Sequence, residues 1–238
     1  ITELAISICA PKVNHIIAVD NRLARTLSDF GSVTVIPNYP SLSDFDINLK
    51  NEERSEIVAL YVGSLTERRG IKVILKSIKK VREKTDLKLR IAGDFYDKEL
   101  KTWAKAYDKE NNLDIDWLGW VDYRELAPII NDADFGLFMN QPGPRYLKGL
   151  PTKIFEYMIM GLPVVSATGP LLKTLIEKHN IGLTVDSTDI NSIAKGIEKM
   201  AQRKDLKEMG KKGNDIVKKS YCWEAKEDKL LRIIEKLT

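Results

Sequence analysis

Short apolar runs rich in β-branched and aromatic residues alternate with amphipathic segments along this chain. The runs are four to eight residues long and read HIIAV, VTVIP, IVALYVG, LKLRIAG, IDWLG, FGLFM, PVVSA and GLTV. Most of them are followed by a helical pattern of ten to fifteen residues. This βαβα order predicts an α/β fold with a mostly parallel, doubly wound sheet.

The segment 71–84 shows what the amphipathic stretches are expected to do. Its apolar residues recur at helical spacing on one face, and lysines occupy the other. The apolar set comprises Ile71, Ile74, Leu75, Ile78 and Val81. We therefore expect a surface helix packed over the sheet.

The domain organisation is very unequal. Residues 41–56 are polar and without periodicity, which makes them the best linker candidate. Two strands precede them, too few to close a domain, and six strands follow. We predict boundaries at residues 1–45, 46–220 and 221–238, with the last segment an amphipathic helix. Because Ile1 replaces an initiator methionine, the start is expected to be a cut end.

Composition excludes several classes of protein. The 238 residues are 43% hydrophobic and 30% charged, which suits a globular chain. The 38 basic and 34 acidic residues are interspersed, so no nucleic-acid partner is expected. Cys9 and Cys222 have no metal-ligand spacing and indicate a reducing compartment. No apolar run approaches the roughly 20 residues of a membrane helix, so we expect a cytoplasmic location, at most peripheral at the inner membrane face.

The first candidate site is the turn after the run IVALYVG. Gly63 ends the strand, and Arg68, Arg69 and Gly70 precede the next helix. The spacing is neither a Walker loop nor a G-x-G-x-x-G motif, so ATP hydrolysis and hydride transfer lose support. Arginine beside a glycine turn at a helix start suits phosphate binding. Taken alone, two arginines on a solvated loop is the simpler interpretation.

The second candidate site is the stretch YLKGLPTKIFEYMIMGLPVVSA, residues 146–167. Thr152 and Lys153 open a helix after Pro151, so their free N–H groups and the lysine charge suit a diphosphate. Glu156 lies at i+4 from Thr152 on the same side, where a carboxylate can accept two ribose hydroxyl protons. The spacing fits equally well a partly exposed helix acid paired with Lys153.

The motifs together resemble a known family. In chain order they read YVGSLTERRGIKVILKSI, LRIAGD, IDWLGWVDYRELAPIINDADFGLFMN, LPTKIFEYMIMGLPVVSA and SYCWEAKEDKLLRIIEKL. They resemble the C-terminal, nucleotide-sugar-binding half of the group 1 retaining glycosyltransferases of the GT-B fold. The resemblance covers residues 57–238 and implies a Rossmann-like donor domain. The stretch HIIAVDNRLARTLSDFGSVTVIPNYP resembles the last strands of the N-terminal, acceptor-binding half.

The resemblance implies roles for individual residues. Glu156 occupies the second glutamate of an E-x7-E motif, which binds the donor ribose. Thr152 and Lys153 match the helix start that holds the diphosphate, and Arg69 matches the basic residue before the first-turn glycine. Arg69 and Lys153 would stabilise the leaving diphosphate, as the catalytic pair. In this comparison Gly63 and Ser64 form the donor turn.

Trp120 and Val121 match the turn that borders the base, through their backbone. Two positions depart from the family pattern. Lys148 stands where the first glutamate of E-x7-E is expected, and Ser64 stands where a basic residue often follows the first-turn glycine. Both lie at the sugar-phosphate end of the site, so the donor sugar is not defined.

No metal or cofactor is implied beyond the donor itself. The Asp-Ala-Asp stretch at 132–134 has the spacing of a metal-binding Asp-x-Asp, but it lies at the entry to the strand FGLFM and is interpreted as structural.

The implied function is transfer of a sugar from a UDP- or GDP-linked donor, with retention, to a glycan or lipid-linked acceptor bound by the N-terminal half. A nucleotide-sugar epimerase of the same fold, or a binding module inactive on its own, are the alternatives. The isolated chain is expected to bind the donor without transfer.

Overall fold

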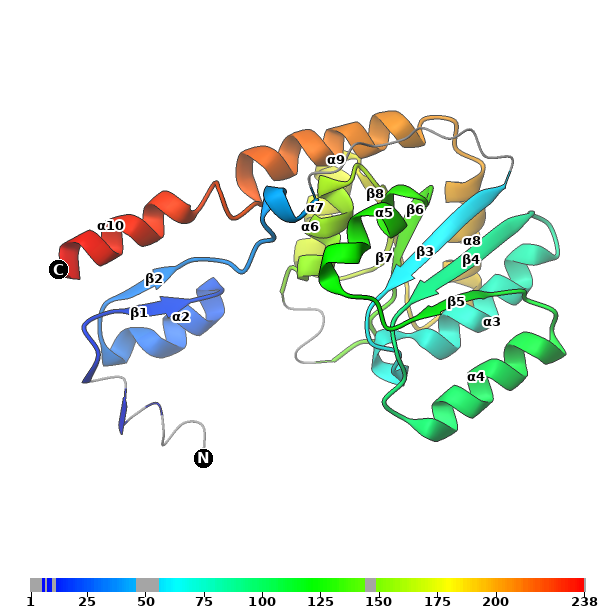
Figure 1. Cartoon of the computed structure of the whole chain (residues 1–238), viewed down its shortest axis with the longest axis horizontal. Coiled ribbons are helices and arrows are strands. Elements are labelled where there is room, and N and C mark those ends of the chain that lie inside the picture. The colour runs from blue at the N-terminus through cyan, green and yellow to red at the C-terminus, as the bar shows by residue number, and fades with distance from the viewer. Residues whose placement is uncertain (1–5, 7, 10–11, 46–55, 144–148, 238) are drawn as a thin grey trace.

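The protein is described from a computed structural model that covers residues 6, 8–9, 12–45, 56–143 and 149–237 (Figure 1). The strands are β1 (Ile16–Ala18), β2 (Val33–Val35), β3 (Ile57–Val62), β4 (Leu87–Ala92), β5 (Asp116–Gly119), β6 (Phe135–Phe138), β7 (Val164–Ala167) and β8 (Gly182–Val185). The helices are α2 (Asn21–Leu27), α3 (Ile71–Arg82), α4 (Lys98–Glu110), α5 (Leu126–Asn131), α6 (Thr152–Ile159), α7 (Pro170–His179), α8 (Ile190–Ala201), α9 (Leu206–Ser220) and α10 (Glu227–Leu237). Short 3-10 turns are η2 (Ser28–Phe30), η3 (Leu42–Phe45), η4 (Glu67–Arg69) and η5 (Tyr123–Glu125).

The main sheet is parallel and doubly wound. Its six strands lie in the order β5-β4-β3-β6-β7-β8. Within this sheet the first strand is the central β3, and β4 and β5 follow it toward one edge. The chain then returns to β6 beside β3 and continues through β7 and β8 toward the other edge. The carboxyl ends of β3 and β6 therefore mark the point where the winding reverses, which is where open α/β sheets bind ligands.

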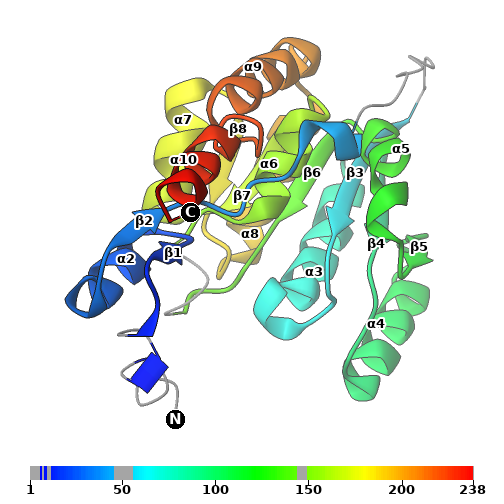
Figure 2. The same ribbon diagram turned by 60° about the vertical axis from the view of Figure 1, so that its left-hand side comes forward.

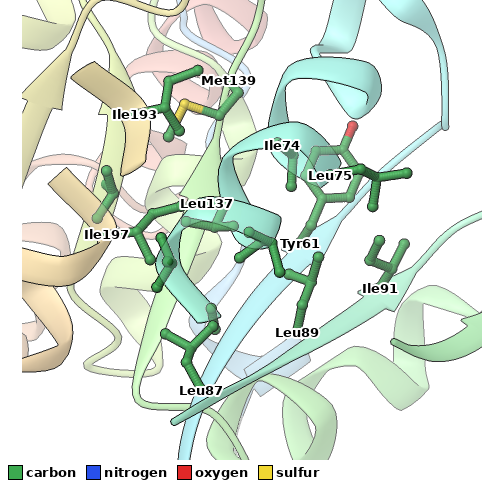
Figure 3. Close-up of a cluster of buried hydrophobic side chains, with 14 of the residues drawn as sticks. Tyr61, Ile74, Leu75, Leu87, Leu89, Ile91, Leu137, Met139, Ile193 and Ile197 are labelled. Carbon is green, nitrogen blue, oxygen red and sulfur yellow. The ribbon is translucent and has the colours of Figure 1, made fainter. Parts of the chain in front are cut away.

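Alternate residues of β3 face two separate apolar cores, because side chains of a strand point to opposite faces. Ala59 and Tyr61 pack with α3, α4 and α8, whereas Leu60 and Val62 pack with α5, α6 and α7. Figure 3 shows part of the first core, with the Tyr61 ring beside Ile74 and Leu75 of α3. The predicted apolar face of 71–84 is confirmed, since all five of its residues are fully buried. Each buried aliphatic side chain contributes roughly 1.5–3 kcal/mol.

The residues before the main domain form a small separate layer. β1 and β2 pair in parallel, and α2 connects them (Figure 2). Asp20 caps α2 by accepting a hydrogen bond from the Leu23 N–H at 2.6 Å. The proposed linker 41–56 is anchored at its start, because Phe45 of η3 is buried in the core beside α6. Residues 46–55 of that linker lie outside the described part of the chain.

The end of the chain differs from the predicted helix over 221–238. The structure has turns at Tyr221–Lys226, and α10 begins only at Glu227. Tertiary contacts explain the interruption, because the Tyr221 ring stacks on Phe155 at 5.1 Å between centroids. The Trp223 N–H also donates to the Pro40 carbonyl at 2.9 Å. These contacts take the place of the helical hydrogen bonds that the local pattern favours.

None of the helices in the described ranges combines the length and apolar character needed to cross a membrane.

Candidate functional site

The turns that follow β3 and β6 are joined at the reversal point of the sheet. The Gln141 N–H donates to the Arg68 carbonyl at 2.8 Å. The Gln141 side-chain amide donates to the carbonyls of Met139 (3.1 Å) and Ser187 (2.9 Å). The turns after β3, β6 and β8 are thereby held together, so the starts of α3 and α6 lie at one edge of the sheet.

The first turn gives its two arginines different environments. Arg68 is exposed, whereas Arg69 is half-buried and folds back toward the end of β3. A Cβ added at Gly63 would lie only 3.0 Å from Arg69 Nη1 and 3.6 Å from the Tyr61 hydroxyl oxygen. The missing side chain of Gly63 therefore leaves the space that the guanidinium occupies. This distinguishes Arg69 from a residue of a freely solvated loop.

Arg69 also carries an uncompensated charge. Within the described part of the chain no carboxylate forms a salt bridge with it, although Lys72, one turn further on, pairs with Glu67. Its polar neighbour is Tyr61, since Arg69 Nη1 and the Tyr61 hydroxyl oxygen lie beside the same point next to Gly63. A half-buried cation held by a neutral group is suited to an anionic ligand.

Helix α6 positions the second pair of candidate residues. Its N-cap is Pro151, which has extended dihedrals, and no side chain in the described residues caps the first turn. The Thr152 hydroxyl donates to the Asn38 carbonyl at 3.4 Å, which ties the helix start to the N-terminal layer. The Ile154 N–H donates to the Pro151 carbonyl at 3.1 Å, whereas the N–H groups of Thr152 and Lys153 and the partial positive charge of the helix start remain available to an anion.

Glu156 and Lys153 form an ion pair one turn along α6. Lys153 Nζ donates to Glu156 Oε2, with side chains 19% and 5% exposed respectively. The pairing predicted from the i,i+3 spacing is thus present. The partly exposed position that accompanied that alternative is wrong, because Glu156 is buried. An ionised carboxylate in this position needs its partner, since an unpaired buried charge is strongly unfavourable.

The loop after β5 approaches Glu156 through a residue that the sequence interpretation missed. Burial and, less strongly, the charges of Glu156 and Asp44 raise the pKa of Tyr123. The Tyr123 ring also packs edge-on against Phe45, with centroids 5.7 Å apart. Val121 of the same loop packs against the core, whereas Trp120 is 71% exposed. The predicted base-binding turn therefore packs, through Val121, against the same core as α6.

Ser64 and Lys148 are the two positions that depart from the family pattern, and the structure describes the first of them. The Ser64 carbonyl accepts a hydrogen bond from the Tyr61 hydroxyl at 3.0 Å. Lys148 lies outside the described residues.

The aspartates at 132–134 have structural partners, as their position indicated. Asp134 Oδ2 accepts from the Val58 N–H at 2.8 Å, and Asp132 pairs with Arg90, which also binds Asp116 at 2.8 Å. In the described ranges no group of three metal-ligating side chains gathers.

Tyr61 and Gln141 are the other residues that the sequence interpretation missed. Tyr61 lies in a run that predicts a buried strand. Its hydroxyl is a polar group among apolar side chains, and that is the signal that could have identified it. Gln141 lies just beyond β6, at the end of another such run.

The doubly wound parallel sheet, with Arg69 and Lys153 near helix starts at its reversal point, has the fold of GT-B glycosyltransferases in comparisons with known proteins. The chain belongs to the family described as glycosyl transferases group 1, whose model matches residues 43–216. A putative colanic acid biosynthesis glycosyltransferase, WcaL of Escherichia coli, is 26% identical over 144 residues, 59% of this chain and 35% of that protein.

Solved structures show the same fold. A glycosyltransferase from Rickettsia africae superposes with a TM-score of 0.79 at 16% identity, over 99% of this chain and 67% of that one. Anabaena HepE in complex with UDP and glucose superposes with a TM-score of 0.78 at 12% identity, over 98% and 66%. The chain spans between 35% and 58% of the length of the first curated relatives it matches.

Proposed function

We propose that this chain is the donor-binding part of a retaining glycosyltransferase that uses a nucleotide diphosphate sugar. The observation that carries the proposal is the half-buried Arg69, which has no carboxylate partner in the described residues and lies at the reversal point of the sheet. Arg69, Lys153 and the first turn of α6 bind the diphosphate and stabilise it as the leaving group. Gly63 and Ser64 line the turn, and Lys148 and Thr152 complete the phosphate end.

Glu156 is assigned to the ribose. Its carboxylate lies one turn behind the helix start, so it is placed for hydroxyl protons and not for phosphate oxygens. Lys153 then has two partners, because it faces Glu156 in the free protein and is charged for a phosphate in the complex. The turn with Trp120 and Val121 borders the base. The UDP in the Anabaena structure supports a uridine or related donor.

The acceptor is a glycan or a lipid-linked sugar, bound by the N-terminal half to which residues 1–45 belong in this proposal. The colanic acid assignment of the Escherichia coli relative supports a role in glycan biosynthesis. No metal or further cofactor is required in this scheme, because Arg69 and Lys153 carry the positive charge. We place the protein in the cytoplasm, at most peripheral at the inner membrane face.

A panel of donors tests the proposal. The chain should bind UDP or GDP in calorimetry, and the full-length protein should transfer one hexose mass from a matching donor to a glycan acceptor, read by mass spectrometry. The anomeric configuration of the product, read by NMR, tests retention. An epimerase would instead release free epimerised sugar and leave the acceptor mass unchanged. Failure of the chain to bind any nucleoside diphosphate would contradict the donor-site assignment.

A further inference from the structure

The Tyr61 side chain connects the core of the donor domain to the cation at its edge. Tyr61 is 3% exposed, and its ring packs in the first core beside Ile74 and Leu75 (Figure 3). Packing of this kind fixes the ring in one rotamer, so the hydroxyl has a defined position. The hydroxyl donates to the Ser64 carbonyl at 3.0 Å.

The same hydroxyl lies beside Arg69, because its oxygen is 3.6 Å and Arg69 Nη1 3.0 Å from the position that a Cβ of Gly63 would take. The guanidinium has only N–H donors, so a hydrogen bond between the two groups runs from Arg69 to the tyrosine oxygen. Donation to the Ser64 carbonyl strengthens the oxygen as an acceptor, because hydrogen bonds in a chain polarise one another. Gly63 directly follows β3, two residues after Tyr61, and the absence of a side chain there leaves open the space in which Arg69 approaches the Tyr61 hydroxyl.

Tyr61 leaves the positive charge of Arg69 available to a ligand. Burial raises the pKa of Tyr61, and the positive charge and hydrogen bond of Arg69 act against that rise. Tyr61 therefore stays neutral and does not cancel the arginine charge. A carboxylate in its place would hold Arg69 equally well but would compete with a phosphate for it.

We propose that Tyr61 is a positioning residue, which holds Arg69 over Gly63 in the orientation that binds the donor diphosphate. This inference rests on the proposed function for its ligand. It assigns to Tyr61 no contact with the donor. Its role is to limit the rotamers of a long flexible side chain before the ligand arrives, which lowers the entropy that binding would otherwise lose.

The test uses the variants Tyr61→Phe, Arg69→Ala and the double variant, with Tyr107→Phe on α4 as the matched control. Tyr61→Phe should weaken binding of UDP or GDP by about 3- to 10-fold, the scale of one hydrogen bond. Binding of the corresponding nucleoside should not change. In the Arg69→Ala background the same substitution should have no further effect, because interacting groups do not act additively. Tyr107→Phe should leave all affinities unchanged.

A second measurement separates the inference from the proposed function. In the ligand-free protein, the Nε–H order parameter of Arg69 should fall in Tyr61→Phe and stay the same in Tyr107→Phe. An unchanged order parameter in Tyr61→Phe would overturn the positioning role, whatever the protein binds. A further loss of diphosphate affinity in the Arg69→Ala background would also overturn it, since the effect would then not pass through Arg69. A third outcome is that the unmodified chain binds no nucleotide while the Arg69 order parameter still falls in Tyr61→Phe. This outcome would contradict the phosphate ligand and the proposed function together.

Discussion

Glu156 and Lys153 show how one pair of residues can support both folding and binding. The pair is mostly buried, so neither charge is well solvated without the other. In the proposed complex, the ribose hydroxyls and a phosphate would replace part of this pairing. In the free protein the ion pair therefore keeps both side chains ordered before a ligand binds.

Removing the Glu156 carboxylate should have the same effect as removing the ribose hydroxyls. Glu156→Ala should lower the affinity for a ribonucleoside diphosphate and leave that for the 2′,3′-dideoxy analogue nearly unchanged, because contacting groups fail to add. Glu156→Gln should be milder, since the amide oxygen still accepts a hydrogen bond at the same reach. Calorimetry on the four combinations gives the coupling. Fully additive losses would show that Glu156 is not the ribose ligand.

Arg69 and its exposed neighbour Arg68 form a natural matched pair. Arg69→Ala should weaken binding of a nucleoside diphosphate by about 1.5–3 kcal/mol, the usual scale for hydrogen bonds to charged groups, and leave nucleoside binding unchanged. Arg68→Ala removes the same charge from a solvated position and should have a much smaller effect. Equal losses for the two variants would assign the effect to net charge and not to a specific contact.

Lys153→Met should destabilise the folded protein itself, because it leaves the buried Glu156 without its partner. We expect a loss of about 2–4 kcal/mol in the free energy of unfolding, measured with urea. Adding Glu156→Gln to this variant should restore part of the loss, since an amide needs no counter-charge. If the double variant is as unstable as the sum of the single ones, the pair does not contribute through its charges.

At the scale of elements, the turn between β3 and α3 depends on a close approach between backbones. Gly70 has a positive φ of 80°, and a Cβ there would collide with the Met139 carbonyl of the neighbouring turn. The close approach brings the turns after β3 and β6 together, as does the bond from the Gln141 N–H to the Arg68 carbonyl. Only glycine meets both requirements.

Gly119 is the control that separates the cost of the positive φ at Gly70 from the cost of the clash with the neighbouring turn. It has a similar φ of 71°, but a Cβ added there would meet nothing within 4 Å. Gly119→Ala should therefore cost about 1–2 kcal/mol for the backbone conformation alone. Gly70→Ala should cost about 1–3 kcal/mol more, because the two turns must move apart. Urea unfolding of both variants measures the difference, and equal losses would mean that the neighbouring turn yields freely.

Much of the architecture follows from local patterns, and the departures have tertiary causes. All eight predicted runs contain strands of the structure, because β-branched and aromatic side chains pack well on a pleated sheet. The predicted terminal helix is interrupted at Tyr221 because its ring stacks on Phe155, which no local pattern encodes. The Lys153 pairing was predictable from spacing within one helix. The proximity of Tyr61 and Arg69 could not be predicted, since a tyrosine in an apolar strand pattern indicates only a buried core position.

At the scale of the whole molecule, aromatic rings join the N-terminal layer to the donor domain. Tyr39 packs edge-on against Phe155 at 4.8 Å and against Tyr221 at 5.6 Å between centroids. Three segments that are distant in sequence thus meet at one cluster. The Leu42 N–H adds a hydrogen bond to Glu224 at 2.9 Å. The small parallel pair β1 and β2 is therefore attached to the rest of the chain through this joint.

The joint should weaken at alkaline pH. Burial, and then the neighbouring Tyr221, raise the pKa of Tyr39 from 10.0 to about 12. The folded state thus favours the neutral phenol, so this stabilisation is complete below pH 10 and is lost as the pH rises toward about 12. Tyr39→Phe should make the unfolding midpoint in urea fall less steeply over that window. Tyr96→Phe, at a position 83% exposed, should leave the steepness unchanged, and an unchanged slope in Tyr39→Phe would contradict the prediction.

The bond between Ser41 and Glu224 has a consequence for the order of events during synthesis. It closes a loop of 183 residues, so its acceptor leaves the ribosome long after its donor. At about 5–20 residues per second the delay is roughly 10–40 s. During that interval Tyr39 lacks its edge-on contact with Tyr221, which is synthesised almost as late as Glu224. Full attachment of the N-terminal layer is thus a late step, which follows the synthesis of α9.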